Sequence, residues 1–116
     1  MDDVVAAMAE FPELTRLAEL HDAGWQFEPV IRDGVVIQVN GLRRWPDGWV
    51  DALRVRYVTD AAGLRADHAG GVTWQREGTL TDVVDGLVSL PLPSERTAPR
   101  LVIARGPALR ESELVR

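Results

Sequence analysis

Several polar side chains in the first half of the chain could bind a charged or polar ligand. They carry guanidinium, amide and carboxylate groups, and two predicted cross-strand rows contain them: Glu28, Gln38 and Arg56 in one, and Gln26, Asn40 and Arg54 in the other. Guanidinium groups beside amides can hold a carboxylate or the backbone of a partner protein through charge-assisted hydrogen bonds. An ordinary solvated sheet face carries the same residue types, which is the alternative interpretation.

A lane of Val30, Val36 and Val58 on the same predicted face favours a protein partner over a small ligand. Trp45 and Trp49 flank a predicted hairpin tip, where they either cap the end of the core or serve as a recognition anchor, since Trp is enriched at binding hot spots. Arg43 opposite Asp51 predicts an ion pair at the rim of this tip, worth well under ~1 kcal/mol. The candidate interaction residues are Arg54, Arg56, Gln38, Asn40, Val36, Val58, Trp45 and Trp49.

Catalytic and metal-binding patterns are weak. Asp60, Asp67 and His68 are the only nearby set of potential ligands or acid–base groups, and no serine, histidine and aspartate set or glycine loop has a recognisable spacing. The chain contains no cysteine, which excludes disulfides and thiolate chemistry. We therefore expect no catalytic residues, no metal and no cofactor, with a small enzyme whose site lacks a motif as one alternative.

Length and net charge limit the number of domains and the classes of function that remain. The 116 residues, 46 % of them hydrophobic, are expected to form one domain with one core. The net charge of -5 is the wrong sign for binding phosphates, and all 13 basic residues are arginine. Nucleic-acid binding through Arg43, Arg44, Arg54 and Arg56 is nevertheless a second alternative. No apolar run has membrane-spanning length and the start does not resemble a signal peptide, so we expect a cytoplasmic protein without membrane contact.

The elements that position these residues are predicted from a turn used twice, Arg32-Asp33-Gly34 and Pro46-Asp47-Gly48. Each lies between alternating apolar residues and is typical of a three-residue hairpin loop with its glycine at positive φ. A two-residue Asp33-Gly34 loop would place Phe27 opposite Asn40 on the polar face. The three-residue loops therefore predict a meander over about residues 25–59, with Gly41 leaving room for the indole of Trp25.

Both registers place the same middle-strand residues on the apolar face, which is a stringent agreement because a slip of one residue exchanges the faces. The second loop predicts Arg43 opposite Asp51, Gly41 opposite Leu53, Val39 opposite Val55, Asn40 opposite Arg54, Gln38 opposite Arg56 and Val36 opposite Val58. The first loop predicts Ile31 opposite Val35, Pro29 opposite Ile37, Phe27 opposite Val39 and Trp25 opposite Gly41.

The remaining segments are predicted from periodicity and breakers. Residues 12–22 are typical of a helix with Leu14, Leu17, Ala18 and His21 on one stripe, and residues 60–71 of a polar crossing with a helical turn near 61–66. Residues 72–77 predict a strand with Trp74 facing inward. Thr79 caps a second helix that ends at Pro91 and whose apolar stripe is Leu80, Val83, Val84 and Leu87.

These elements predict an α+β fold: an N-terminal helix, an antiparallel meander of three to four strands and a C-terminal helix, with both helices on one sheet face. We expect residues 1–11 to form a short helix or a mobile segment and residues 12–90 a single domain. Residues 91–116 read as a proline-rich linker and tail, with a possible edge strand at 101–104 in this chain or on a partner.

Over residues 12–90 the order of elements resembles that of the double-stranded-RNA-binding domain. That family holds phosphates with a lysine cluster at the start of its last helix, where this chain has Thr79-Leu80-Thr81-Asp82 and no lysine. No RNA-binding residues are carried over, because a shared topology does not imply a shared function. The sequence thus favours a non-catalytic protein-interaction or regulatory module, with a second copy of the chain as the expected partner.

Overall fold

The computed structural model describes residues 15–105, and in this part of the chain two α-helices accompany a six-stranded antiparallel sheet. Sheet order follows chain order from β1 to β6. The elements are α2 (Thr15–Asp22), β1 (Gln26–Arg32), β2 (Val35–Arg44), the 3-10 turn η2 (Pro46–Gly48), β3 (Val50–Tyr57), β4 (Asp60–Ala66), β5 (Gly71–Gly78), α3 (Leu80–Ser89) and β6 (Ala104–Arg105). The α+β class is confirmed, but five main strands and a short sixth replace the predicted three to four.

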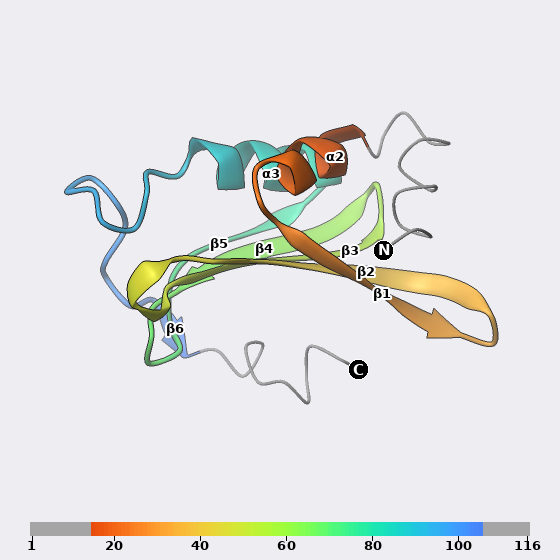
Figure 1. Ribbon diagram of the computed structural model, residues 1–116, viewed down its shortest axis with the longest axis horizontal. Helices are drawn as coiled ribbons and strands as arrows, with labels where there is room; N and C mark the ends of the chain where they lie inside the picture. Colours follow the sequence, from red (N-terminus) through yellow and green to blue (C-terminus); the bar gives the residue numbers. More distant parts are fainter. Residues whose placement is uncertain (1–14, 106–116) are drawn as a thin grey trace.

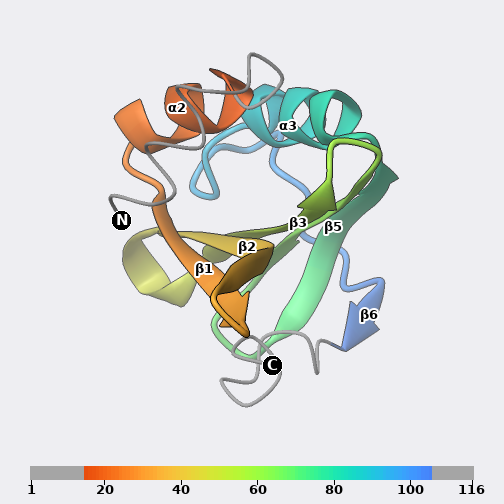
Figure 2. The ribbon, with the colours of Figure 1, turned by 90° about the vertical axis from the view of Figure 1, so that its right-hand side faces the viewer.

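Both helices cover the same face of the sheet, as predicted (Figure 1), and they lie side by side above it (Figure 2). The core between the two layers contains Leu17 and Leu20 of α2, Val83 and Val84 of α3, and Phe27 of β1. Burial of these side chains is what holds the helices on the sheet, because two helices of 8 and 10 residues are too short to be stable alone.

The second hairpin has the predicted register. Arg43 faces Asp51, Gly41 faces Leu53 and Val39 faces Val55. The backbone N–H of Trp45 donates to the carbonyl of Trp49 at 2.8 Å, so the three residues of η2 form the loop, with Gly48 at φ +81°. The predicted faces are also confirmed, since Phe27 is buried and Arg56 is exposed.

The first hairpin differs from the predicted register. Asp33 and Gly34 both have positive φ, 52° and 77°, and they close a two-residue turn in which Arg32 faces Val35. Two successive positive φ values define the type I′ turn, whose twist matches that of the flanking strands. The prediction of a three-residue loop here was wrong because it did not allow for an irregularity farther along the strands.

That irregularity is a β-bulge in β2. Ile31 faces Val36 while Val30 faces Gln38, which leaves Ile37 as an extra residue. The pairs beyond the bulge are shifted by two residues from the prediction, so the face of each β1 side chain is preserved. The shifted pairs place Phe27 opposite Gly41, Pro29 opposite Val39 and Glu28 opposite Asn40.

Gly41 provides the space that this arrangement needs. A Cβ atom added there would lie 2.6 Å from Cε1 of Phe27 and 3.3 Å from Cε3 of Trp25. The room predicted for Trp25 is therefore shared with Phe27, whose ring stacks with the indole at a centroid distance of 6.4 Å.

Residues 60–66 form a strand and not the predicted polar crossing with a helical turn. β4 pairs with β3 on one side and β5 on the other. Its Gly63 lies under α3, where an added Cβ would come within 2.8 Å of Cγ1 of Val83. A segment of low strand propensity is thus held extended by two neighbours and a helix, a tertiary effect that overrides local preference.

The segment around α3 follows the prediction closely. Trp74 of β5 packs against the core, and all four residues of the predicted α3 stripe are buried. The side chain of Thr79 accepts a hydrogen bond from the N–H of Asp82 at 3.1 Å, which is the expected N-cap. The C-terminal segment adds a short edge strand in this chain, in which Ala104 of β6 faces Val72; it overlaps the strand predicted at 101–104 only at Ala104, since residues 101–103 are not in a strand.

Part of the predicted N-terminal helix can be compared with the structure. α2 spans Thr15–Asp22, with Leu17 buried and His21 exposed, and Leu20 joins the buried face although the predicted stripe omitted it. The predictions for residues 1–11, for the start of this helix including Leu14, and for the tail after residue 105 lie outside the described residues. No helix within residues 15–105 is long and apolar enough to span a membrane.

A buried ion pair crosses from β3 to β4. Arg65 donates from Nε to Oδ1 of Asp51 at 2.6 Å and from its terminal nitrogen to Oδ2 at 2.9 Å. A third bond runs from Arg65 to the carbonyl of Pro91 at 2.5 Å, just after α3, and Trp45 Nε1 donates to Asp51 at 3.0 Å. The pair therefore ties the end of α3 and the second hairpin to the middle of the sheet.

Candidate functional site

The arginine and amide side chains on the sheet face away from the helices bond to one another. Gln38 Nε2 donates to Asn40 Oδ1 at 2.8 Å, and Arg56 Nε donates to Gln38 Oε1 at 3.0 Å. Arg54 lies 3.6 Å from the carboxylate of Asp60. These contacts orient the side chains toward groups of the same chain.

The predicted rows on this face also change. Because of the bulge, Glu28 shares a row with Asn40 and Arg54, and Gln38 shares one with Val30. The predicted lane of Val30, Val36 and Val58 does not form. Val36 faces Ile31, and Val58 lies in the turn between β3 and β4, where its carbonyl accepts the N–H of Leu80 at 2.8 Å.

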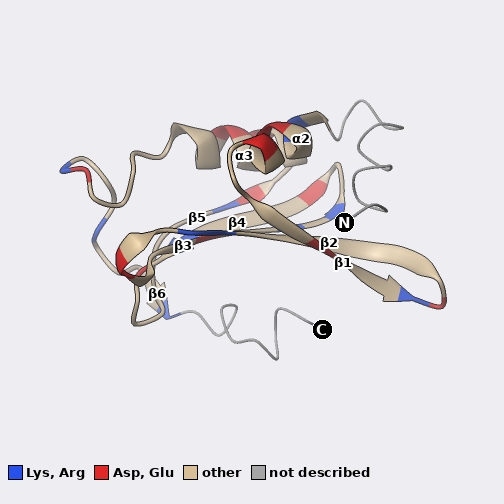
Figure 3. Cartoon of the chain, viewed as in Figure 1, with Lys and Arg blue, Asp and Glu red and all other residues tan. Residues whose placement is uncertain are grey.

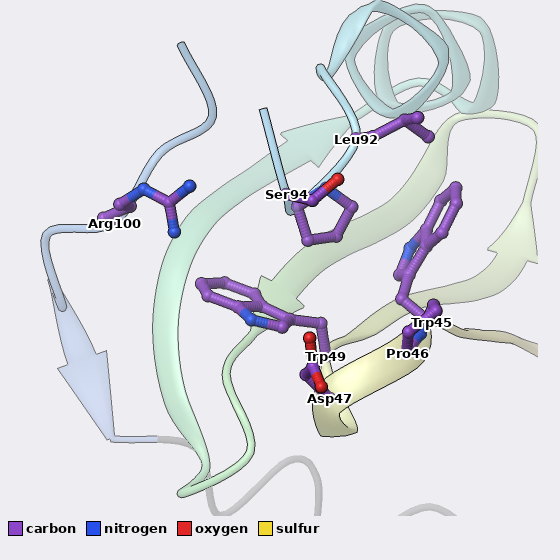
Figure 4. A pocket seen from close by; sticks show the side chains of 8 residues that line it. Trp45, Pro46, Asp47, Trp49, Leu92, Ser94 and Arg100 are labelled. Carbon is purple, nitrogen blue, oxygen red and sulfur yellow. The ribbon is translucent and has the colours of Figure 1, made fainter. Parts of the chain in front are cut away.

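Trp45 and Trp49 line a pocket of about 320 Å³ at the tip of the second hairpin. Figure 4 shows their indoles on two sides of the pocket, with Leu92 and Ser94 of the linker above them and Arg100 beyond. Both indoles are half-buried, and the guanidinium of Arg43 lies 4.2 Å from the Trp45 ring centre. The chain's own linker therefore occupies much of the surface that a partner would use here.

One arginine of this tip, Arg43, is also engaged within the chain. Arg43 donates to the carbonyl of Ala23, and the predicted rim ion pair between Arg43 and Asp51 is replaced by the buried pair of Asp51 with Arg65. Sequence reasoning missed Arg65 because nothing local distinguishes it from the exposed arginines of the chain.

The acid–base candidates do not converge. Asp60 begins β4, whereas Asp67 and His68 follow its end, a separation of about 20 Å along an extended strand. Asp67 has a local role: its Oδ1 accepts the N–H groups of Gly71 at 2.8 Å and Ala69 at 3.0 Å. The hydrogen bond from Gly71 is the main cause of a lowered pKa for Asp67; burial opposes it as the next-largest effect, and the hydrogen bond from Ala69 and the nearby charges of His68 and Arg105 lower the pKa further.

A cluster of exposed apolar side chains lies on the first hairpin. Residues 30–38, which we name the hairpin arm, extend past the last recorded pair of β2 with β3, Val39 with Val55, and project beyond the helices (Figure 1). Four of its side chains are well exposed: Ile31 (52 %), Val35 (61 %), Val36 (43 %) and Ile37 (39 %). Charge on the arm is confined to Arg32 and Asp33 at its turn (Figure 3).

An open hollow of about 520 Å³ lies beside the N-terminal half of β1. The residues that line it come from the end of α2 and the first strand: His21, Trp25, Gln26, Phe27, Glu28 and Pro29. The arm and the hollow thus belong to the same strand, one at each end of it. Of the predicted interaction residues, the arm includes Val36 and Gln38.

Comparisons with protein-family models, with curated proteins and with solved structures find no significant match to this chain. The resemblance to the double-stranded-RNA-binding domain is limited to the order of elements, and five main strands between the helices depart from the three of that pattern.

Proposed function

We propose that this chain is a small non-catalytic interaction module that associates with a second copy of itself through the hairpin arm. The observation that carries the proposal is the run of exposed aliphatic side chains on residues 31–37. Monomeric soluble proteins rarely expose large contiguous apolar patches, and such patches commonly mark interaction sites. Burial of such side chains against a partner removes apolar surface from water and so favours association.

The form of the arm supports the same proposal. An isolated two-stranded ribbon is marginally stable in water, and the half of the hairpin that projects past β3 has no second layer among the described residues. Association would provide that layer. The arginine-bearing sheet face is a weaker candidate, because Arg54 and Arg56 already contact Asp60 and Gln38.

Sedimentation velocity from low to high micromolar concentration tests the proposal. We expect the wild-type chain of 12.8 kDa to show a concentration-dependent increase toward twice this mass. The variant Ile31→Ser should stay monomeric at concentrations where the wild type associates. Val88→Ser is the matched control, since Val88 on α3 is 55 % exposed but lies away from the arm. A wild-type chain that remains monomeric throughout would contradict the proposal.

A further inference from the structure

β1 is an edge strand with an unused side. The sheet order places it next to β2 alone, so among the described residues no strand pairs with its other side. The backbone N–H and C=O groups on that side are a ready template for another strand. The arm and the hollow both lie along this edge, which makes it the natural place for an interface.

We propose that the partner is a second copy of this chain and that the two β1 strands pair antiparallel around a two-fold axis at Val30. This inference rests on the proposed function and specifies its geometry. The paired strands would join the two sheets into one, with the arm of each copy beside the hollow of the other.

The strand itself restricts the possible registers. In an antiparallel pair, two facing residues either both direct their backbone N–H and C=O groups toward the other strand or both direct them away from it. The two cases alternate along each strand. Facing residues are therefore both even-numbered or both odd-numbered, and a two-fold axis passes through a single residue position. Within β1 the axis can lie at any residue from Gln26 to Arg32.

Charge selects one of these axes. An axis at Glu28 or Arg32 places two like charges opposite each other. An axis at Pro29 places Glu28 opposite Val30, and an axis at Ile31 places Arg32 opposite Val30. Only an axis at Val30 places Glu28 of each copy opposite Arg32 of the other. Within residues 15–105 neither of these exposed side chains forms an ion pair in its own chain. Opposite charges that face each other directly stabilise a strand pair, and like charges destabilise it.

Residue types that often protect an edge strand from pairing with other strands here allow pairing in this one register. Proline and charged side chains discourage indiscriminate strand pairing. Pro29 removes at most one donor from each strand, and its carbonyl remains available as an acceptor. The charges of Glu28 and Arg32 neutralise each other at one register only; at the others they face a like charge or have no opposite charge across from them. The edge therefore favours a closed dimer over open-ended assembly.

The same register brings the arm to the hollow. Ile31 of the second copy faces Pro29 of the first, and the turn at the end of the second copy's arm passes Phe27 and Gln26. Pro29, Phe27 and Gln26 all line the hollow. Ile31 shares the helix-side face of β1 with Phe27, because the two are four residues apart on a strand. Two hollows in the dimer would thus each receive the apolar side of one arm.

A disulfide tests the position of the axis. The chain has no cysteine, so Val30→Cys introduces a single thiol. Facing residues in an antiparallel pair have Cα atoms about 4.5–5.5 Å apart, within the range that a disulfide spans. We expect rapid, nearly complete formation of a covalent dimer under mild oxidation. Gln26→Cys is the control: the two thiols would be about 27 Å apart along the strands and should not link.

A charge exchange tests the register independently. Glu28→Arg and Arg32→Glu each create two repulsive pairs in the homodimer and should weaken association by roughly tenfold. In an equimolar mixture of the two variants, the mixed dimer has two attractive pairs. Association should then return to near the wild-type level. Glu95→Arg changes the net charge as Glu28→Arg does, at an exposed linker position, and should have no such effect.

The outcomes separate this inference from the proposed function. Cross-linking at position 30 together with recovery in the mixture supports the two-fold at Val30. A wild-type chain that dimerises while position 30 does not cross-link, or while the mixture does not recover, overturns the β1 pairing and leaves association through the arm standing. A wild-type chain that is monomeric overturns both the β1 pairing and association through the arm.

Discussion

Removal of the Asp51 carboxylate should be the most destabilising single change in the described part of the chain. Asp51 is 2 % exposed and Arg65 is 1 % exposed, and two of the three hydrogen bonds from Arg65 end on Asp51. In Asp51→Ala the guanidinium keeps only the carbonyl of Pro91 as an acceptor. The indole N–H of Trp45 loses its acceptor as well.

The magnitude follows from the cost of an unpaired buried charge. Breaking a buried ion pair by removing one partner costs about 3–5 kcal/mol, because the remaining charge has neither water nor a counter-ion. A domain of this size is typically stable by about 5–15 kcal/mol, so much of the free energy of unfolding would be lost. Replacing both partners by apolar residues is often nearly neutral. The double variant Asp51→Leu/Arg65→Met should therefore be more stable than Asp51→Ala.

Urea unfolding followed by tryptophan fluorescence measures these differences, because Trp45 lies beside the pair. Asp85→Ala is the matched control. Its carboxylate contacts Arg16 at the surface and is 55 % exposed, so its loss should cost less than ~1 kcal/mol. A cost for Asp51→Ala as small as that of the control would refute the reasoning. So would a double variant less stable than Asp51→Ala.

Three further changes test other parts of the fold. Gly48→Val should destabilise by at least ~2 kcal/mol in urea unfolding, because Gly48 has φ +81° and an added Cβ would lie 2.7 Å from Cβ of His68. Trp25→Ala should cost about 3 kcal/mol in the same assay, since the indole is only 5 % exposed. The carboxylate of Asp67, whose pKa is lowered from 3.8 mainly by the N–H of Gly71, stabilises the fold above its unfolded-state pKa. The stability advantage of the wild type over Asp67→Asn should therefore shrink as the pH falls below 3.8 and through the folded-state pKa.

The controls for these changes come from the chain itself. Gly34 has a similar φ of +77° with open space around it, so Gly34→Val should cost less than Gly48→Val, and equal costs would exclude the contact with His68. Trp49→Ala should cost less than Trp25→Ala, because Trp49 is half-buried. A wild-type advantage over Asp67→Asn that stays constant across acid pH would contradict the assigned hydrogen bonds.

Local features of the fold were predictable from residue types. The Pro46-Asp47-Gly48 loop and its register followed from turn chemistry and from alternation, and the Thr79 cap and the buried stripe of α3 followed from helix periodicity. The faces of β1 were also predicted correctly, although its register was not. A shift of two residues leaves every side chain on its face, so the hydrophobic pattern alone could not reveal the bulge at Ile37.

Non-local features required the tertiary structure. The sequence of β4 has little strand propensity, and it is extended because β3 and β5 pair with both of its sides. Arg65 is buried because the strand register places it directly opposite Asp51.

The sequence by itself determined that the chain turns near Asp33-Gly34 and at Pro46-Asp47-Gly48 and which side of each early strand is apolar, because turns and alternation depend on neighbouring residues. Only the tertiary structure decided which apolar residues stay in contact with water. The arm is exposed because its recorded pairing with β3 stops at Val39, and its aliphatic residues look like core residues in the sequence. Burial depends on what packs above a residue, and that is set by chain segments far from it in sequence.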